Sequence, residues 1–183
     1  LADGMKYFIV FTLLAYIAVI FYMPVLKYFV GKDYWDGLGV VPIVMLAEIF
    51  MGVYFNLSFW YKLTDKTWWG ALISAIGAAV MIIFNIIFVP RIGYWACAWG
   101  GLIGYGTAMV LSFLIGRGKY PVKYDYKVIG GCVGLTILLI AVSKMPSLIG
   151  MELPTWATLC LNTVLLGIYC LPWGIKLIKS RRI

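Results

Sequence analysis

Three polar side chains interrupt long apolar runs of this sequence, and each could do chemistry inside a membrane. Glu48 lies in the run VVPIVMLAEIFMGVYFNLSFWYKL, and Asn56 follows it in the same run. Steps of four residues place Glu48, Gly52 and Asn56 along one stripe of a helix. Asn85 lies deep in the next apolar run, AAVMIIFNIIFV. Together these side chains predict a polar face that points into a helix bundle or a water-filled cavity.

The chemistry of this face depends on Glu48. A carboxylate in the middle of a membrane helix costs several kcal/mol unless it is protonated, paired or facing water. One interpretation is therefore a proton or cation site on a transport pathway. The alternative is a structural hydrogen bond from Glu48 to a neighbouring helix. Asn56 and Asn85 are open to the same two interpretations, because amide side chains often join membrane helices.

Other chemistries lack the residues that they need. The chain has no histidine, which excludes histidine bases, Ser–His nucleophiles and most zinc sites within it. No strand is expected that could precede a glycine-rich phosphate loop. The four cysteines, Cys97, Cys132, Cys160 and Cys170, lack metal-ligand spacing. We therefore expect no enzyme, no metal and no cofactor, and we interpret the cysteines as small packing residues.

The amino-acid composition indicates whether these residues lie in water or in lipid. Of the 183 residues, 64% are apolar and 12% are charged, and the mean hydropathy is +0.99. Soluble domains are close to half apolar and about a quarter charged. A chain with so few polar groups cannot coat a surface that faces water. It is therefore expected to be an integral membrane protein.

Apolar segments of bilayer length predict an all-α, polytopic membrane protein. A helix needs about 20 apolar residues to cross a membrane, and the runs do not alternate as barrel strands do. Six candidate spans are separated by polar or turn-rich breaks, at about 6–29, 38–62, 67–90, 93–116, 127–143 and 153–176. Thr64 or Asp65, in the break before the third span, is expected to cap that helix. Ala96, Gly100 and Gly104 form a small-residue face that predicts close helix packing.

Basic residues predict the orientation of these spans. Of the 15 Lys and Arg residues, eleven fall on the side that holds both termini and four on the other side. Positive charge favours the cytoplasmic side, so both termini are expected there. Anionic lipid headgroups are the expected partner of this charge. Nucleic acid is not, because no basic stretch forms a domain of its own.

The order of several short motifs resembles a known family. Val41–Pro42 opens a helix, and the stretch from Gly52 to Ser58 precedes a Lys66–Thr67 turn. Asn85 then leads to a turn at Val89–Pro90 and Gly93, followed by a small-residue helix from Ala96. Over roughly residues 30–125 this order resembles the polysaccharide (O-antigen type) flippases of the multidrug/oligosaccharidyl-lipid/polysaccharide exporter superfamily.

The resemblance implies an architecture and an activity. Members of this family have twelve to fourteen helices in two bundles around a central cavity. By this resemblance, residues 1–126 are four helices of the C-terminal bundle, and 127–183 are two additional helices with a basic cytoplasmic tail. The family moves lipid-linked oligosaccharide across the bacterial inner membrane by alternating access, in some members coupled to protons or sodium. Glu48, Asn56 and Asn85 would then lie near the cavity, the substrate or ion pathway.

The family pattern is incomplete here, and two other functions stay open. The family often lines its cavity with basic residues for the diphosphate, whereas no Lys or Arg lies in the middle of a span. Diphosphate binding is therefore expected in an N-terminal half of the same chain, and the opening with Leu1 suggests the interior of a longer protein. One alternative is a multidrug cation antiporter of the same superfamily. The other is a non-transporting membrane scaffold subunit of a polysaccharide synthase.

Overall fold

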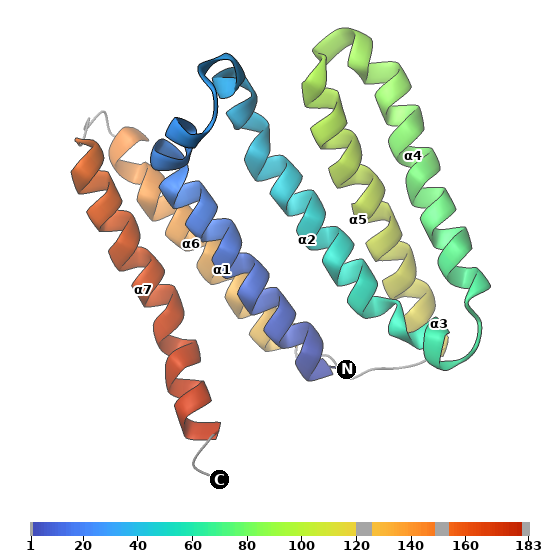
Figure 1. Ribbon diagram of the computed structural model, residues 1–183. Coiled ribbons are helices and arrows are strands. Elements are labelled where there is room, and N and C mark those ends of the chain that lie inside the picture. The colour runs from blue at the N-terminus through green and yellow to red at the C-terminus, as the bar shows by residue number, and fades with distance from the viewer. Residues whose placement is uncertain (1, 120–125, 149–153, 181–183) are drawn as a thin grey trace. The chain divides into compact units, whose positions relative to one another are not determined.

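The computed structural model describes residues 2–119, 126–148 and 154–180. Every regular secondary-structure element in these residues is a helix (Figure 1). The elements follow one another as α1 (Ala2–Leu26), η1 (Lys27–Phe29), η2 (Lys32–Val40), α2 (Val41–Leu57), α3 (Phe59–Leu63), α4 (Trp68–Ile92), α5 (Tyr94–Lys119), α6 (Tyr126–Leu148) and α7 (Thr155–Ser180). The described part contains no strand, as the apolar runs predicted.

Five helical segments are long and apolar enough to cross a bilayer. They cover Gly4–Phe29, Lys32–Leu63, Trp68–Ile92, Tyr94–Gly118 and Lys127–Met145. A shorter apolar helix, Thr155–Leu171, lies within α7. Backbone groups in lipid must be satisfied within the segment, and a helix does this. The prediction of an all-α, multi-pass membrane protein is confirmed.

Two compact units divide the chain. The first contains residues 1–9 and 37–125, and the second contains residues 10–36 and 126–183. The division into 1–126 and 127–183 stays a prediction about a larger transporter. The compact units share its boundary near residue 126, but they assign most of α1 to the second unit.

In the first unit α5 packs against both α2 and α4 (Figure 1). Glycines permit the close approach of α4 and α5. A Cβ on Gly77 would lie 3.0 Å from the carbonyl oxygen of Gly104, and a Cβ on Gly104 would lie 2.9 Å from the carbonyl oxygen of Gly77. This is the close packing that the small-residue face predicted, with α4 as its partner.

A break after α2 turns the chain inward within the same unit. Ser58 is fully buried, and its Oγ donates a 2.6 Å hydrogen bond to the carbonyl of Phe55. A serine hydroxyl that bonds back to its own helix competes with the helical ladder and bends it. The short helix α3 follows, and it brings Trp60 and Tyr61 into a buried aromatic cluster with Tyr54.

The turn before α4 differs from the expectation. Thr67 occupies the position before the helix, and no side chain caps it. Thr64 instead donates its hydroxyl to the carbonyl of Trp60, at 2.8 Å, so it ends α3. Asp65 has a φ of 54°, in the left-handed region that a short polar side chain tolerates. The predicted cap was wrong because the turn uses both residues to finish the preceding helix.

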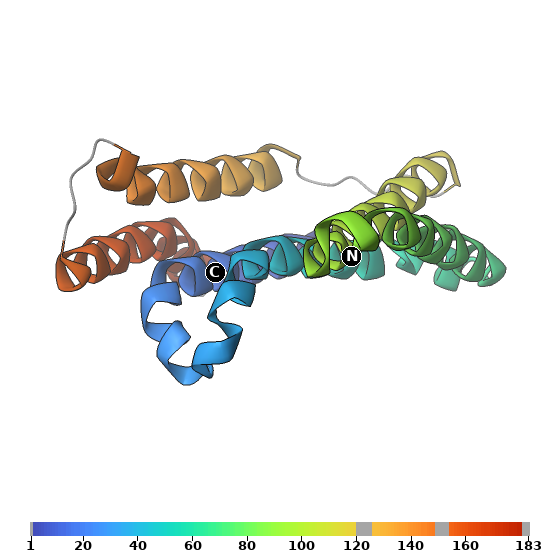
Figure 2. The ribbon, with the colours of Figure 1, turned by 90° about the horizontal axis from the view of Figure 1, so that it is seen from above.

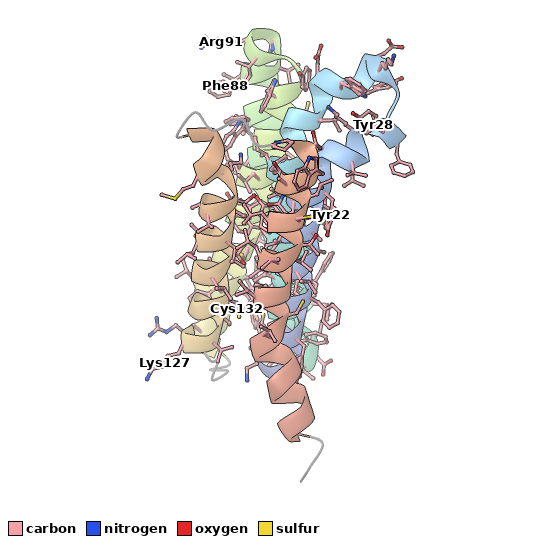
Figure 3. All side chains as sticks on the ribbon, turned by 90° about the vertical axis from the view of Figure 1, so that its left-hand side faces the viewer. Tyr22, Tyr28, Phe88, Arg91, Lys127 and Cys132 are labelled. Atoms are coloured by element: carbon pink, nitrogen blue, oxygen red, sulfur yellow. The ribbon has the colours of Figure 1, made fainter. Side chains whose placement is uncertain are left out.

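The second unit joins α1, α6 and α7 through a buried amide. Asn162 of α7 donates to the carbonyl of Phe21 in α1 at 3.0 Å, and it accepts from the Ser143 hydroxyl of α6 at 2.7 Å. Tyr22, which lies beside α7 in Figure 3, pairs with Thr163 at 2.8 Å. Hydrogen bonds of this kind hold membrane helices together where no hydrophobic force does.

A compact loop of two 3-10 helices, η1 and η2, leads from α1 toward α2 (Figure 2). The Lys27 ammonium lies over the rings of Tyr28 and Trp35, at 5.2 and 5.3 Å from the ring centroids. The Trp35 indole also donates to the carbonyl of Val30, at 3.1 Å. These contacts order the polar segment between the first two spans.

Candidate functional site

Glu48 is an exposed carboxylate on an apolar helix. It lies seven positions into α2, about 10 Å from the first residue at 1.5 Å per residue, inside the candidate span Lys32–Leu63. No hydrogen bond or ion pair reaches it from the described residues. If Glu48 has a structural role as a hydrogen-bond partner of another helix, that helix does not lie among the described residues.

Asn56 lies on the same stripe, but its amide is used locally. Its Nδ2 donates a 3.0 Å hydrogen bond to the carbonyl of Gly52, four residues earlier on α2. Between the two polar side chains, Gly52 faces the Phe8 ring of α1, which would collide with any Cβ at this position. We call Glu48, Gly52 and Asn56 the α2 polar stripe. It forms one face of α2, as the spacing predicted.

The opposite side of α2 faces α5. A Cβ on Gly101 of α5 would lie 3.9 Å from the Ala47 Cβ, and one on Gly106 would lie 3.4 Å from the Phe50 ring. At 3.6 residues per turn, a helix face that holds Ala47 and Phe50 turns Glu48 and Asn56 away from α5. The α2 polar stripe is therefore not part of the α2–α5 interface.

Asn85 lies in a different interface. It projects from α4 onto Gly100 of α5, where an added Cβ would collide with its Oδ1 and lie 3.1 Å from its Cγ. Its Oδ1 is buried and has no hydrogen-bond partner among the described residues. Gly100 and Gly101 are neighbours on α5, so Asn85 and Glu48 lie at similar levels along it. At this level α5 separates them, and Glu48 and Asn56 share a face that Asn85 does not.

A second group of polar side chains was missed by the sequence analysis. The Tyr54 hydroxyl lies 2.8 Å from the Ser74 Oγ, 3.3 Å from the Tyr61 hydroxyl and 3.4 Å from the carbonyl of Gly70. Tyr61 follows Tyr54 by seven residues, so helical spacing already places both on one face, and this spacing is the signal that could have found the group.

Asn162 was missed as well, although its signal was readable. It is a single amide in the apolar run LCLNTVLLG, the same kind of signal that singled out Asn56 and Asn85. It is 3% exposed and bonds to two other helices. Of the three amides, it is the one with hydrogen bonds to other helices.

The described segments contain no cluster of side chains suited to metal binding or thiol chemistry. No group of three or more His, Cys, Asp or Glu residues there could hold a metal ion. Cys97, Cys160 and Cys170 are exposed and Cys132 is buried, and all four are free thiols. The α2 polar stripe thus offers one carboxylate, which could hold a proton or a single cation.

No protein family, curated protein or solved structure matches this chain.

Proposed function

We propose that this chain is part of a membrane transporter, the C-terminal portion of a flippase that moves lipid-linked oligosaccharide across the bacterial inner membrane by alternating access. The observation that carries the proposal is Glu48, an exposed carboxylate on a helix of membrane-spanning length. The chain uses this carboxylate in no ion pair among the described residues. A proton or sodium ion is its proposed coupling partner.

A charge on Glu48 would be costly in lipid. An ionised acid that faces lipid near the bilayer centre costs about 2.5–3.5 kcal/mol even on insertion scales. Such residues therefore face a bundle interior or a water-filled cavity, and they mark ion and substrate pathways. The α2 polar stripe would line one wall of that cavity. An N-terminal half of the same chain would supply the opposite wall, with the basic groups for the diphosphate.

The class of substrate rests on the sequence resemblance. The motif order from Val41 to Ala96 supports lipid-linked oligosaccharide. The same exposed carboxylate also suits an amphipathic organic cation, so a multidrug antiporter is the second candidate. In both, the proposed orientation has the termini of this segment in the cytoplasm, where most Lys and Arg residues would lie.

Replacement of the carboxylate tests the proposal. Glu48→Gln in the full-length protein should strongly reduce export of surface polysaccharide at equal membrane protein levels, because the amide cannot release a proton or neutralise a cation. Asp65→Asn is the matched control, since Asp65 is an exposed acid in the turn between two spans. It should leave export unchanged.

Each outcome has a distinct meaning. Normal export by Glu48→Gln would refute the role given to the carboxylate. If a deletion strain were sensitive to drugs but kept its surface polysaccharide, the proposed substrate would be a cationic drug and not an oligosaccharide. An immunoblot of host membranes adds the mass of the native chain. A band at 20.5 kDa, copurifying with a glycosyltransferase, would instead support the scaffold subunit.

A further inference from the structure

A buried indole at the end of the first unit has no hydrogen-bond acceptor. Trp60 of α3 is 4% exposed, and its Nε1 has no partner among the described residues. Its five-membered ring lies on Gly116 of α5, where an added Cβ would be 2.8 Å from Cδ1 and 2.9 Å from Nε1. Gly116 has no side chain that could accept the bond. The indole N–H is therefore a buried donor without an acceptor among the described residues.

A buried hydroxyl in the same region is also unused. Ser112 is fully buried, and its Oγ has no partner among the described residues. It lies one helical turn before Gly116 and one turn after Ala108. Ala108 belongs to the aromatic cluster that contains Trp60 and Tyr61. Positions four apart on a helix share one face, so Ser112 projects into this cluster.

The spacing of Ser112 and Gly116 on α5 sets the scale of the separation between the two groups. Four residues rise about 6 Å along α5, and the Trp60 indole lies over the later of the two positions. A water molecule that bonds to two atoms at about 2.8 Å each spans up to about 5.6 Å. Buried polar groups in native proteins are almost always satisfied, by protein or by ordered water.

We propose that Trp60 Nε1 and Ser112 Oγ bind one buried water molecule between α3 and α5. The chemistry selects the ligand. The indole N–H donates and needs an acceptor, whereas the serine hydroxyl can donate or accept. Water meets both needs, and a metal cation does not, because the indole N–H presents its positive end. This site is independent of the proposed transport function.

A double-mutant cycle on the full chain in detergent measures the link between the two groups. Ser112→Ala should lower the unfolding midpoint in the wild-type background and change it little in the Trp60→Phe background, where the water has already lost a partner. Thr107→Val is the matched control. It removes an α5 hydroxyl that bonds within its own helix, to the carbonyl of Ile103 at 2.7 Å. Its effect should be the same in both backgrounds.

A second measurement identifies the ligand in the wild-type chain and does not depend on the variants folding. Solid-state NMR in bilayers should show magnetisation transfer from water protons to the Trp60 indole N–H. The indole resonance of Trp60 would first be identified by sequential resonance assignment. A midpoint that rises in Ser112→Ala, or equal effects of Ser112→Ala in both backgrounds, would overturn the proposal. So would a linked pair without a water signal, which would mean a direct bond between Trp60 and Ser112.

Discussion

The close approach of α4 and α5 at Gly77 and Gly104 predicts the effect of a single methyl group. On α5, a Cβ at Gly104 would lie 2.9 Å from the Gly77 carbonyl oxygen and 2.9 Å from the Met81 Cβ. Carbon atoms pack best at about 3.5–4.0 Å. Gly104→Ala must therefore push α4 away by about half an ångström, and the obstacle includes backbone, which cannot rotate out of the way. We expect a loss of about 1–3 kcal/mol from overpacking.

A second glycine on the same helix provides the reference. A Cβ at Gly101 would meet the Ala47 Cβ at 3.9 Å, an ordinary contact. Both substitutions gain the same helix propensity, up to about 1 kcal/mol. The difference between Gly104→Ala and Gly101→Ala therefore isolates the packing cost, and Gly101→Ala itself should be neutral or stabilising.

The assay is the free energy of unfolding of the full chain in mild detergent, from titration with SDS followed by tryptophan fluorescence. Gly104→Ala should unfold at lower SDS than wild type, and Gly101→Ala at the same or higher SDS. Equal stability of the two variants would refute the close approach of α4 and α5 at this point.

Three further variants test other contacts. Asn162→Leu should cost about 1–3 kcal/mol, because it breaks bonds to two helices and such bonds are worth about 0.6–1.7 kcal/mol each; SDS titration measures this, and an unchanged midpoint would contradict the two Asn162 bonds. Tyr54→Phe should cost about 1–3 kcal/mol by leaving Ser74 and neighbouring groups without a partner, and a thermal melt should fall accordingly; a variant as stable as wild type would show that this network is not formed. Gly100→Ala should be destabilising in the wild-type background and tolerated together with Asn85→Ala, which removes the colliding amide; equal losses in both backgrounds by SDS titration would place Asn85 elsewhere.

The membrane spans could be predicted from sequence because bilayer thickness fixes their length. The expected span 67–90 is Trp68–Ile92, and 93–116 is Tyr94–Lys119. The expected span 38–62 differs in kind, since it contains a helix, a break at Ser58 and a second helix. A buried serine that bonds to its own helix leaves the apolar pattern unchanged, so the pattern could not show the break.

The candidate site was predictable in part for a similar reason. The spacing of Glu48 and Asn56 fixes their common face on α2, because a helix repeats every 3.6 residues. The direction in which that face points depends on neighbours far away in the sequence. Asn85 shows the limit. Its depth suggested the same polar face, but its side chain lies against Gly100 on the far side of α5.

The glycine contact between α4 and α5 has a mechanical consequence. If the two helices parted at Gly77 and Gly104, backbone would border part of the gap, and neither glycine has a side chain that could fill it. Both helices would lose their dispersion contacts at once. The α2–α5 contact is softer, because Phe50 has a ring that can follow a moving partner. The α4–α5 hairpin should therefore move as one rigid body, and any sliding should occur at the contact between α5 and α2.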